Sequence, residues 1–256
     1  MKYIIANWKM NLGIRESVAL ARGVVRVLRG RDVTPEVILC PSATSLSEVH
    51  KVLSRTRVHL GAQNVGPAES GAWTGEVSVA MLEDVGCQHV IIGHSERRQL
   101  LGESDLLIKQ KISTVLTSRL TPVLCVGESK VDHDAGKAQE VVAAQLHSAL
   151  FGNELAGRRV IQIAYEPIWA IGSGTPASVG ETVTMHTFIR EVAKKILGAR
   201  DEQIIVLYGG SVDGGNIHQF LRESQIDGVL VGGASLKPAQ LEDIIIATAE
   251  IIEAQK

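Results

Sequence analysis

Short apolar runs recur along the whole chain, and amphipathic stretches separate them. Eight of these runs predict strands, at about Tyr3–Trp8, Val37–Cys40, Val58–Ala62, His89–Ile92, Pro122–Val126, Val160–Tyr165, Ile204–Leu207 and Gly228–Val231. Several are apolar at successive positions rather than at alternate ones. That pattern is typical of strands buried on both faces, as in a parallel sheet.

The stretches between these runs have helical periodicity. Ser17–Leu28 carries apolar residues close to a 3.6-residue period. Similar patterns predict helices at Ser104–Thr117, Ala138–Leu150, Val183–Leu197, Asn216–Arg222 and Pro238–Ile252, with shorter ones at Ser45–Leu53 and Val79–Val85 and a brief one starting at Ser95.

This strand-then-helix order predicts an α/β fold, a single (βα)8 barrel domain over residues 1–256. Parallel strands need right-handed crossovers, which the helices would supply. The length also matches the roughly 250 residues typical of such barrels. An open doubly wound sheet is the main alternative. It is weakened because no Gly-x-Gly-x-x-Gly motif follows the first run.

Composition narrows the function classes. The net charge is −2, so there is no basic excess to favour nucleic acid as a partner. The three cysteines are widely spaced and fit neither a disulfide framework nor a zinc knuckle, which favours a reducing, cytoplasmic compartment. We expect no signal peptide and no membrane-spanning segment. No cluster has metal-ligand spacing, so we predict no metal and no cofactor.

Polar residues and glycines follow the predicted strands at the same end. Lys9 follows the first, His94 the fourth and Glu166 the sixth, while glycine pairs follow the seventh and eighth. In an eight-stranded barrel all of these lie on one rim, where such enzymes place their chemistry. Pro167 cannot donate to a strand ladder, so Glu166 should stand at a strand end. There it is either a shielded general base or an ordinary loop carboxylate.

The other rim residues also have two interpretations each. Ser95 is a plausible helix cap, so the His94 imidazole would abut a helix N-terminus and stay neutral, unless it is simply a packed histidine. Lys9 could neutralise a developing enolate, form a Schiff base or be a surface lysine. The glycine pairs suit phosphate binding or two tight turns. Together these groups favour proton abstraction next to a carbonyl in a small phosphorylated sugar.

Several segments identify a family. The chain resembles the triosephosphate isomerases from end to end, most clearly at Ala6–Asn11, Gly61–Asn64, Gly71–Ser78, Ile92–Arg98, Cys125–Glu128, the Glu166 segment, Tyr208–Ser211 and Leu230–Leu236. The resemblance implies interconversion of dihydroxyacetone phosphate and D-glyceraldehyde 3-phosphate through an enediolate, in glycolysis and gluconeogenesis.

The resemblance also implies a role for each rim residue. Glu166 would shuttle the proton, and His94 would polarise the carbonyl. Lys9 would stabilise negative charge, oriented by Asn7 and supported by Glu96. The substrate phosphate would be held by backbone amides of Gly172, Ser211, Gly232 and Gly233. Ile171 and Leu230 would enclose the base, which raises its basicity by desolvation.

A lid and a dimer are implied as well. Residues 166–177 would close over the substrate, with two hinges and a latch formed by Pro167, Ile168, Trp169, Thr175, Pro176, Ala177 and Tyr208. Pro176 departs from the family pattern, and because proline fixes one dihedral we expect it to shift the balance between open and closed lid. Loop 66–77 resembles the arm that enters the neighbouring subunit of a homodimer, with Trp73 and Thr74 near its far end.

Two other functions stay open at this point. One is a different phosphosugar barrel, either an isomerase for a four-carbon phosphate or a Schiff-base aldolase that uses Lys9. The other is a catalytically silent barrel that binds a phosphometabolite or a partner protein. The presence of Lys9, His94 and Glu166 together argues against the silent barrel.

Overall fold

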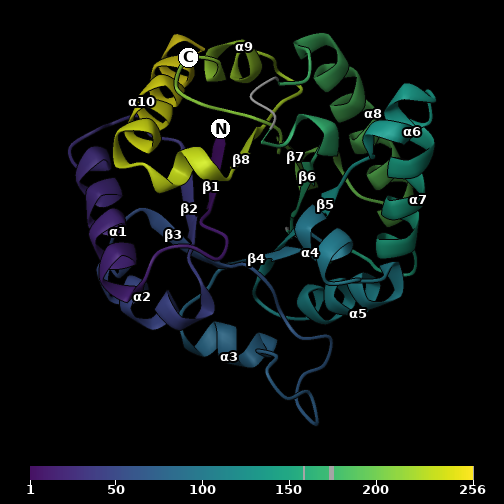
Figure 1. The fold of residues 1–256 in the computed structure, drawn as a ribbon, viewed down its shortest axis with the longest axis horizontal. Coiled ribbons are helices and arrows are strands. Elements are labelled where there is room, and N and C mark those ends of the chain that lie inside the picture. Colours follow the sequence, from purple (N-terminus) through teal and green to yellow (C-terminus); the bar gives the residue numbers. More distant parts are fainter. Residues whose placement is uncertain (158, 173–175, 256) are drawn as a thin grey trace.

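Eight parallel strands close into one barrel in chain order. The computed structural model describes residues 1–157, 159–172 and 176–255. Each strand pairs with the next, and the last pairs with the first (Figure 1). The strands are β1 Tyr3–Asn7, β2 Glu36–Cys40, β3 Val58–Ala62, β4 His89–Ile92, β5 Thr121–Val126, β6 Ile161–Tyr165, β7 Ile204–Tyr208 and β8 Gly228–Val231. The predicted eight-stranded α/β barrel is therefore confirmed.

Helices ring the barrel on its outside (Figure 1). They are α1 Ile14–Leu28, α2 Leu46–Leu53, α3 Val79–Asp84, α4 Ser95–Leu100, α5 Asp105–Leu116, α6 Lys130–Asp134, α7 Ala138–Leu150, α8 Val179–Leu197, α9 Ile217–Leu221 and α10 Pro238–Ala254. Short 3-10 turns add η1 Ala43–Ser45, η2 Ile168–Ala170, η3 Asp201–Gln203 and η4 Gly233–Leu236. No helix among the described residues is long and apolar enough to cross a membrane.

The observed helix boundaries show which local sequence signals determine where a helix begins and ends. α8 begins one turn earlier than its apolar pattern, because Ser178 and Glu181 form a capping box that needs no apolar residue. It ends at Gly198, whose φ of 59° is a left-handed conformation that glycine adopts without strain. The short helix α6 was not predicted, because it buries no side chain and so carries no apolar period.

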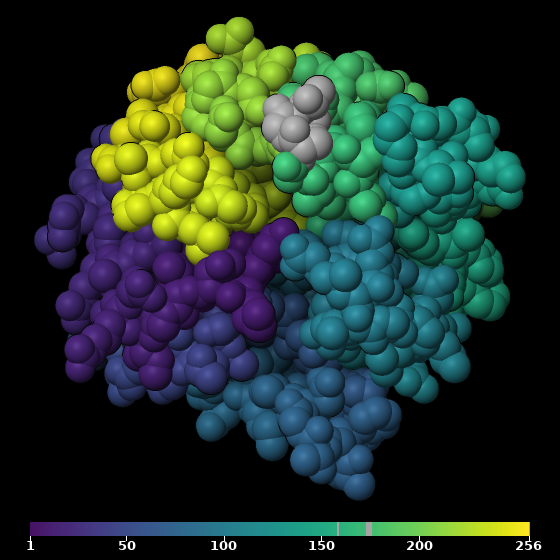
Figure 2. Space-filling model, in the orientation of Figure 1, coloured from purple at the N-terminus to yellow at the C-terminus, as the bar shows by residue number. Residues whose placement is uncertain are grey.

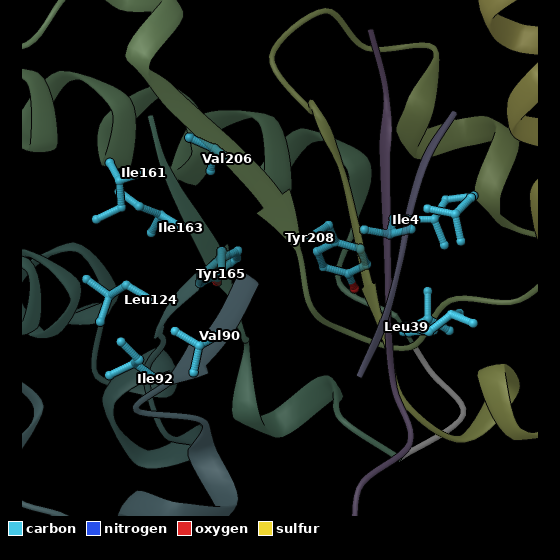
Figure 3. Packing of buried hydrophobic residues seen from close by; sticks show 14 of the residues in the cluster. Ile4, Leu39, Val90, Ile92, Leu124, Ile161, Ile163, Tyr165, Val206 and Tyr208 are labelled. Carbon is cyan, nitrogen blue, oxygen red and sulfur yellow. The ribbon is translucent and has the colours of Figure 1, made fainter. Parts of the chain in front are cut away.

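Two apolar layers hold the barrel together. Side chains that point outward from the strands pack against the helices, and Figure 3 shows part of this layer, including Ile4, Leu39, Val90 and Tyr208. Side chains that point inward fill the barrel itself: Ile5, Ile38, Cys40, Ile91, Val123, Cys125, Ala164, Ile205, Leu207 and Leu230. Because the interior is packed, a ligand has room only beyond the strand ends.

Candidate active site

One pocket at the carboxyl ends of the strands gathers most of the predicted site residues. Its volume is about 590 Å³, and its lining includes Asn7, Lys9, His94, Glu166, Ile171, Gly172, Ser211, Leu230, Gly232 and Gly233. These residues follow β1, β4, β6, β7 and β8 or lie at their ends. The parallel barrel thus brings together residues more than 200 positions apart in the sequence.

Glu166 and His94 are in direct contact at the base of this pocket. Their side chains are only 3% and 7% exposed, and His94 Nε2 lies 3.0 Å from Glu166 Oε1. The other carboxylate oxygen, Oε2, accepts the backbone N–H of Ser95 at 2.9 Å. The carboxylate is therefore fully engaged by protein donors in this arrangement.

This contact shifts the pKa values of both groups in the direction opposite to the expected one. Burial raises the pKa of Glu166, but the facing His94 and the Ser95 N–H outweigh burial and lower it overall. Burial lowers the pKa of His94, but the Glu166 carboxylate outweighs that and raises it overall. The sequence predicted a carboxylate made more basic and a neutral imidazole. The pairing of the two groups opposes both.

His94 itself caps α4. Its Nδ1 accepts the backbone N–H of Glu96 at 3.2 Å, and Ser95 is the first residue of the helix rather than its cap. The predicted placement of the imidazole at a helix N-terminus therefore holds, although the capping residue was assigned wrongly. Because Nδ1 accepts a hydrogen bond, the ring proton of the neutral form lies on Nε2, the nitrogen that faces Glu166 and the pocket.

Lys9 is held at the pocket wall by its neighbours. Its φ of 52° is unusual for a residue with a side chain. Asn7 Oδ1 accepts the Lys9 backbone N–H at 3.0 Å, and Gln63 Nε2 donates to the Lys9 carbonyl at 2.8 Å. Lys9 Nζ pairs with Glu96 Oε1 at 2.5 Å. Asn7 and Glu96 therefore contact Lys9 as the resemblance implied.

Glycines let the backbone and the charged side chains approach closely. A Cβ on Gly209 would lie 2.9 Å from Glu166 Cγ, and one on Gly232 would lie 3.1 Å from Lys9 Cε. Ser211 and Gly233 line the same end of the pocket, and Ser211 Oγ donates to the Ala170 carbonyl at 2.6 Å. A side chain at Gly209 would therefore force the Glu166 side chain or the Tyr165 carbonyl to shift.

The residues around the predicted lid are anchored on both sides. Trp169 Nε1 donates to Glu128 Oε1 at 2.7 Å, and Tyr165 Oη donates to the same oxygen at 3.0 Å. On the far side, the Ala177 backbone N–H donates to Tyr208 Oη at 3.0 Å. Pro167 is buried, and Ile168 and Pro176 are partly buried. Thr175, assigned to the second hinge, lies outside the described residues.

Three contributors to the pocket region were not predicted. The Ser95 N–H binds Glu166 through the backbone, which leaves no signal in side-chain identity. Glu128 is buried, accepts the Trp169 Nε1–H and lies two residues after β5, where a carboxylate could have been noted. Lys237 adds a second cation to the pocket lining, and its place just after η4 could have suggested it. Within the described ranges, no group of three or more His, Cys, Asp or Glu residues could hold a metal ion.

Comparison with known proteins decides the family. The family model described as triosephosphate isomerase matches residues 2–248. The chain belongs to the triosephosphate isomerase family. The triosephosphate isomerase of Rhodopirellula baltica is 45% identical over 95% of this chain and 96% of its own, and that of Aquifex aeolicus is 43% identical over 95% and 98%. The crystal structure of the Bartonella henselae triosephosphate isomerase matches with a TM-score of 0.86 at 33% identity, covering 98% of this chain and 99% of its own.

Family membership fixes the reaction. The chain is an isomerase that interconverts dihydroxyacetone phosphate and D-glyceraldehyde 3-phosphate, a step of glycolysis and gluconeogenesis. The aldolase and the silent barrel are thereby set aside. Trp73 and Thr74 lie away from the pocket, on the exposed loop between β3 and α3.

Proposed function

We propose that Glu166 is the base of this isomerase and that His94 and Lys9 stabilise the enediolate oxygens. The observation that carries the proposal is the direct contact between a buried carboxylate and a buried imidazole, at 3.0 Å, in the wall of the pocket. A carboxylate this close to an Nε2–H donor can take a proton from carbon while the donor serves the neighbouring oxygen.

The steps follow from these positions. Glu166 removes a proton from the carbon next to the carbonyl of dihydroxyacetone phosphate, and the carbonyl oxygen takes up the negative charge. His94 Nε2–H and the Lys9 ammonium stabilise that oxygen. Return of the proton from Glu166 to the other carbon, with exchange of a hydroxyl proton between the two oxygens, gives glyceraldehyde 3-phosphate. No proton is gained or lost overall.

The resting pair must separate before this can happen. In the free protein Glu166 Oε2 is held by the Ser95 N–H and Oε1 by His94, so neither oxygen is free to accept a proton from carbon. A substrate oxygen placed at His94 Nε2 displaces the carboxylate. That weakens the contact with His94, the main influence that lowers the pKa of Glu166, so burial, which raises the pKa, counts for more. Substrate binding therefore activates the base.

The phosphate is assigned to the glycine-lined side of the pocket. Gly172, Ser211, Gly232 and Gly233 line that side, and Lys237 supplies a cation near it. Backbone N–H groups at short turns bind phosphate oxygens without a side chain in the way.

We also assign residues 166–177 to a lid that excludes water from the enediolate. Its described parts support this role, because hydrogen bonds that a motion can break join Trp169 to Glu128 and Ala177 to Tyr208. Ile171 and Leu230 would then enclose Glu166. Pro176 should shift the open–closed balance without abolishing activity.

The direct test is Glu166→Gln in a coupled assay with dihydroxyacetone phosphate. The amide keeps the size of the side chain but cannot take a proton, so kcat should fall by about 10²- to 10⁴-fold with little change in KM. Glu140→Gln, on the exposed surface of α7, is the matched control and should keep full activity. Equal turnover by the wild type and Glu166→Gln would overturn the assignment.

We also propose a homodimer, whose interface is the exposed apolar surface beside the candidate active site. Figure 1 shows the loop between β3 and α3 projecting beyond the ring of helices. A hollow of about 590 Å³ next to Lys9 and Glu96 is lined partly by Met10, Leu100 and Leu101. These three side chains are 96%, 77% and 66% exposed, and Trp73 on the loop is 50% exposed. Exposed apolar side chains gathered at a hollow mark an interface.

The hollow fits an arm from a second copy. Figure 2 shows the depression between the purple residues after β1 and the teal residues around α4. An arm placed there would bring Thr74 towards Asn7 and Glu96 of the other copy and complete the wall of its pocket. A cytoplasmic location is proposed with it, because all three cysteines are free thiols, as is usual in a reducing compartment.

A further inference from the structure

Positive charge is concentrated on the outer surface of α1 and α2, among residues that do not line the active-site pocket. Arg22 and Arg26 lie at i and i+4 on one face of α1, and Arg29, the C-cap residue, lines the same hollow. All three are exposed, and none forms an ion pair with any described residue. Like charges at this spacing destabilise a helix slightly, although Arg26 in the last turn is favourably placed at the negative end of the helix dipole.

These arginines line a groove rather than a flat surface. A hollow of about 550 Å³ between α1 and α2 is lined by Arg22, Arg26, Arg29, Lys51, Glu48, Val18, Val25 and Val52. A second hollow of about 340 Å³ shares Val25 and Arg29 with it and adds Arg31, Arg55 and Arg57. We call the two together the basic groove. Figure 1 shows α1 and α2 side by side on the outer ring.

The charge of the basic groove is almost uncompensated. Its lining carries only two carboxylates, Glu48 and Asp32, and Glu48 already pairs with Lys51 at 2.6 Å. The whole chain has a net charge of −2, so the excess of arginine here is local. The guanidinium fork binds carboxylates with two parallel hydrogen bonds, which suits recognition of an acidic ligand.

The apolar residues of the basic groove favour some acidic ligands over others. Val18, Val25 and Val52 are partly buried and form an apolar strip between the cations. A phosphate chain has nothing to place on that strip. Single-stranded nucleic acid needs aromatic side chains for stacking, and none lines either hollow. A peptide with acidic and apolar faces satisfies both the cations and the valines.

We propose that the basic groove docks an acidic amphipathic helix of a partner protein. The part of α1 from Val18 to Leu28 spans about 15 Å at about 1.5 Å per residue, a length that a helix of about ten residues covers. Its carboxylates would face Arg22, Arg26 and Arg29, and its apolar side chains would lie on the valines. The groove shares no lining residue with the hollow assigned to the dimer arm, so both could be occupied at once.

The probe for this proposal is a fluorescein-labelled 14-residue helical peptide with Glu and Leu on opposite faces, measured by fluorescence anisotropy against the full chain. Binding should weaken as salt is raised, because the contacts are exposed charges. Arg26→Glu should weaken binding by at least about tenfold, since it places a like charge against the peptide. Lys195→Glu, an exposed cation on α8, is the matched control and should bind as the wild type does.

Each alternative ligand of the basic groove would give a different experimental result, and each of these results would overturn the proposal. A scrambled peptide of the same composition that binds equally well shows charge attraction without a docking site. Tighter binding of poly-U RNA or inorganic polyphosphate assigns the groove to phosphate chains. Salt-dependent self-association assigns it to a second copy. Isomerase activity of Arg26→Glu should equal that of the wild type, which shows that the variant is folded and keeps this test separate from the catalytic proposal.

Discussion

At the scale of single residues, the site depends on positions where a side chain is absent. Gly209 follows β7, donates its N–H to the Tyr165 carbonyl at 2.7 Å and leaves room for the Glu166 side chain. A methyl group at Gly209 would meet Glu166 Cγ at 2.9 Å and the Tyr165 carbonyl oxygen at 3.1 Å. Either the Glu166 side chain or the Tyr165 carbonyl must move. The Glu166 side chain moves more easily, because it is not part of the backbone.

Gly209→Ala should therefore misplace the base. A displacement of about 1 Å can cost about 10² in rate, so kcat should fall by about that factor, and overpacking should cost about 1–3 kcal/mol of stability. Gly180→Ala is the control, because that glycine lies in α8 with open space around it and alanine should stabilise the helix slightly. Steady-state kinetics and urea unfolding measure both effects. Unchanged kcat in Gly209→Ala would show that Glu166 has more freedom than its contacts indicate.

At the scale of elements, titratable side chains at the amino ends of the strands form contacts between neighbouring strands. His59 on β3 places Nε2 at 3.0 Å from Glu36 Oε2 on β2 and Nδ1 at 2.8 Å from Gln88 Oε1. Both ring nitrogens face oxygen atoms, so the doubly protonated ring satisfies both contacts. Accordingly, the hydrogen bond with Glu36 raises the pKa of His59, and the hydrogen bond with His59 lowers the pKa of Glu36.

The two shifts define a pH window for stability. The raised pKa of His59 gives stability that is fully present below about 6.5 and is lost as pH rises through the folded value. The lowered pKa of Glu36 gives stability present above about 4.5 and lost as pH falls through the folded value. His59→Gln should therefore cost most between these limits, by about 1 kcal/mol or less because both side chains are about one-third exposed.

Urea unfolding of the wild type, His59→Gln, Glu36→Gln and the double variant across pH 4–9 measures this contribution. The two single variants should lose the same pH-dependent part, and the double variant should lose no more than either alone. A difference from the wild type that stays constant across the range would show that the pair acts by packing, without titration.

The strands and their ends also show what the sequence alone could predict. The barrel, the rim and the residues Lys9, His94 and Glu166 followed from apolar periodicity and from the order of strand ends. The contact between His94 and Glu166 did not, because it depends on how far the ends of β4 and β6 lie apart across the barrel. For that reason the sequence did not show that the pairing lowers the pKa of Glu166 and raises that of His94, although both residues were assigned to the same site.

At the scale of the whole molecule, the exposed surface predicts how chains associate. Trp73 stands half exposed on the projecting loop, and removing its apolar area from the proposed interface should break the dimer. Trp73→Asp should sediment as a monomer at micromolar concentration and lose activity, since the arm would complete the neighbouring pocket in the proposed dimer. Phe151→Asp is the control: this side chain is 58% exposed beside α7 and takes no part in the proposed interface. A Trp73→Asp variant that remains dimeric would place the interface elsewhere.

The reactivity of the three buried thiols depends on whether the protein is folded. Burial raises the pKa of Cys87 to about 12 and raises the pKa values of Cys40 and Cys125 as well. The thiolate is the form that oxidants and alkylating agents attack, so all three sulfur atoms are inert while the barrel is closed. They become reactive only in molecules that have opened. The resistance of these thiols to oxidation therefore depends on the stability of the fold: any substitution that loosens the barrel, wherever it lies, also exposes the cysteines to oxidative damage.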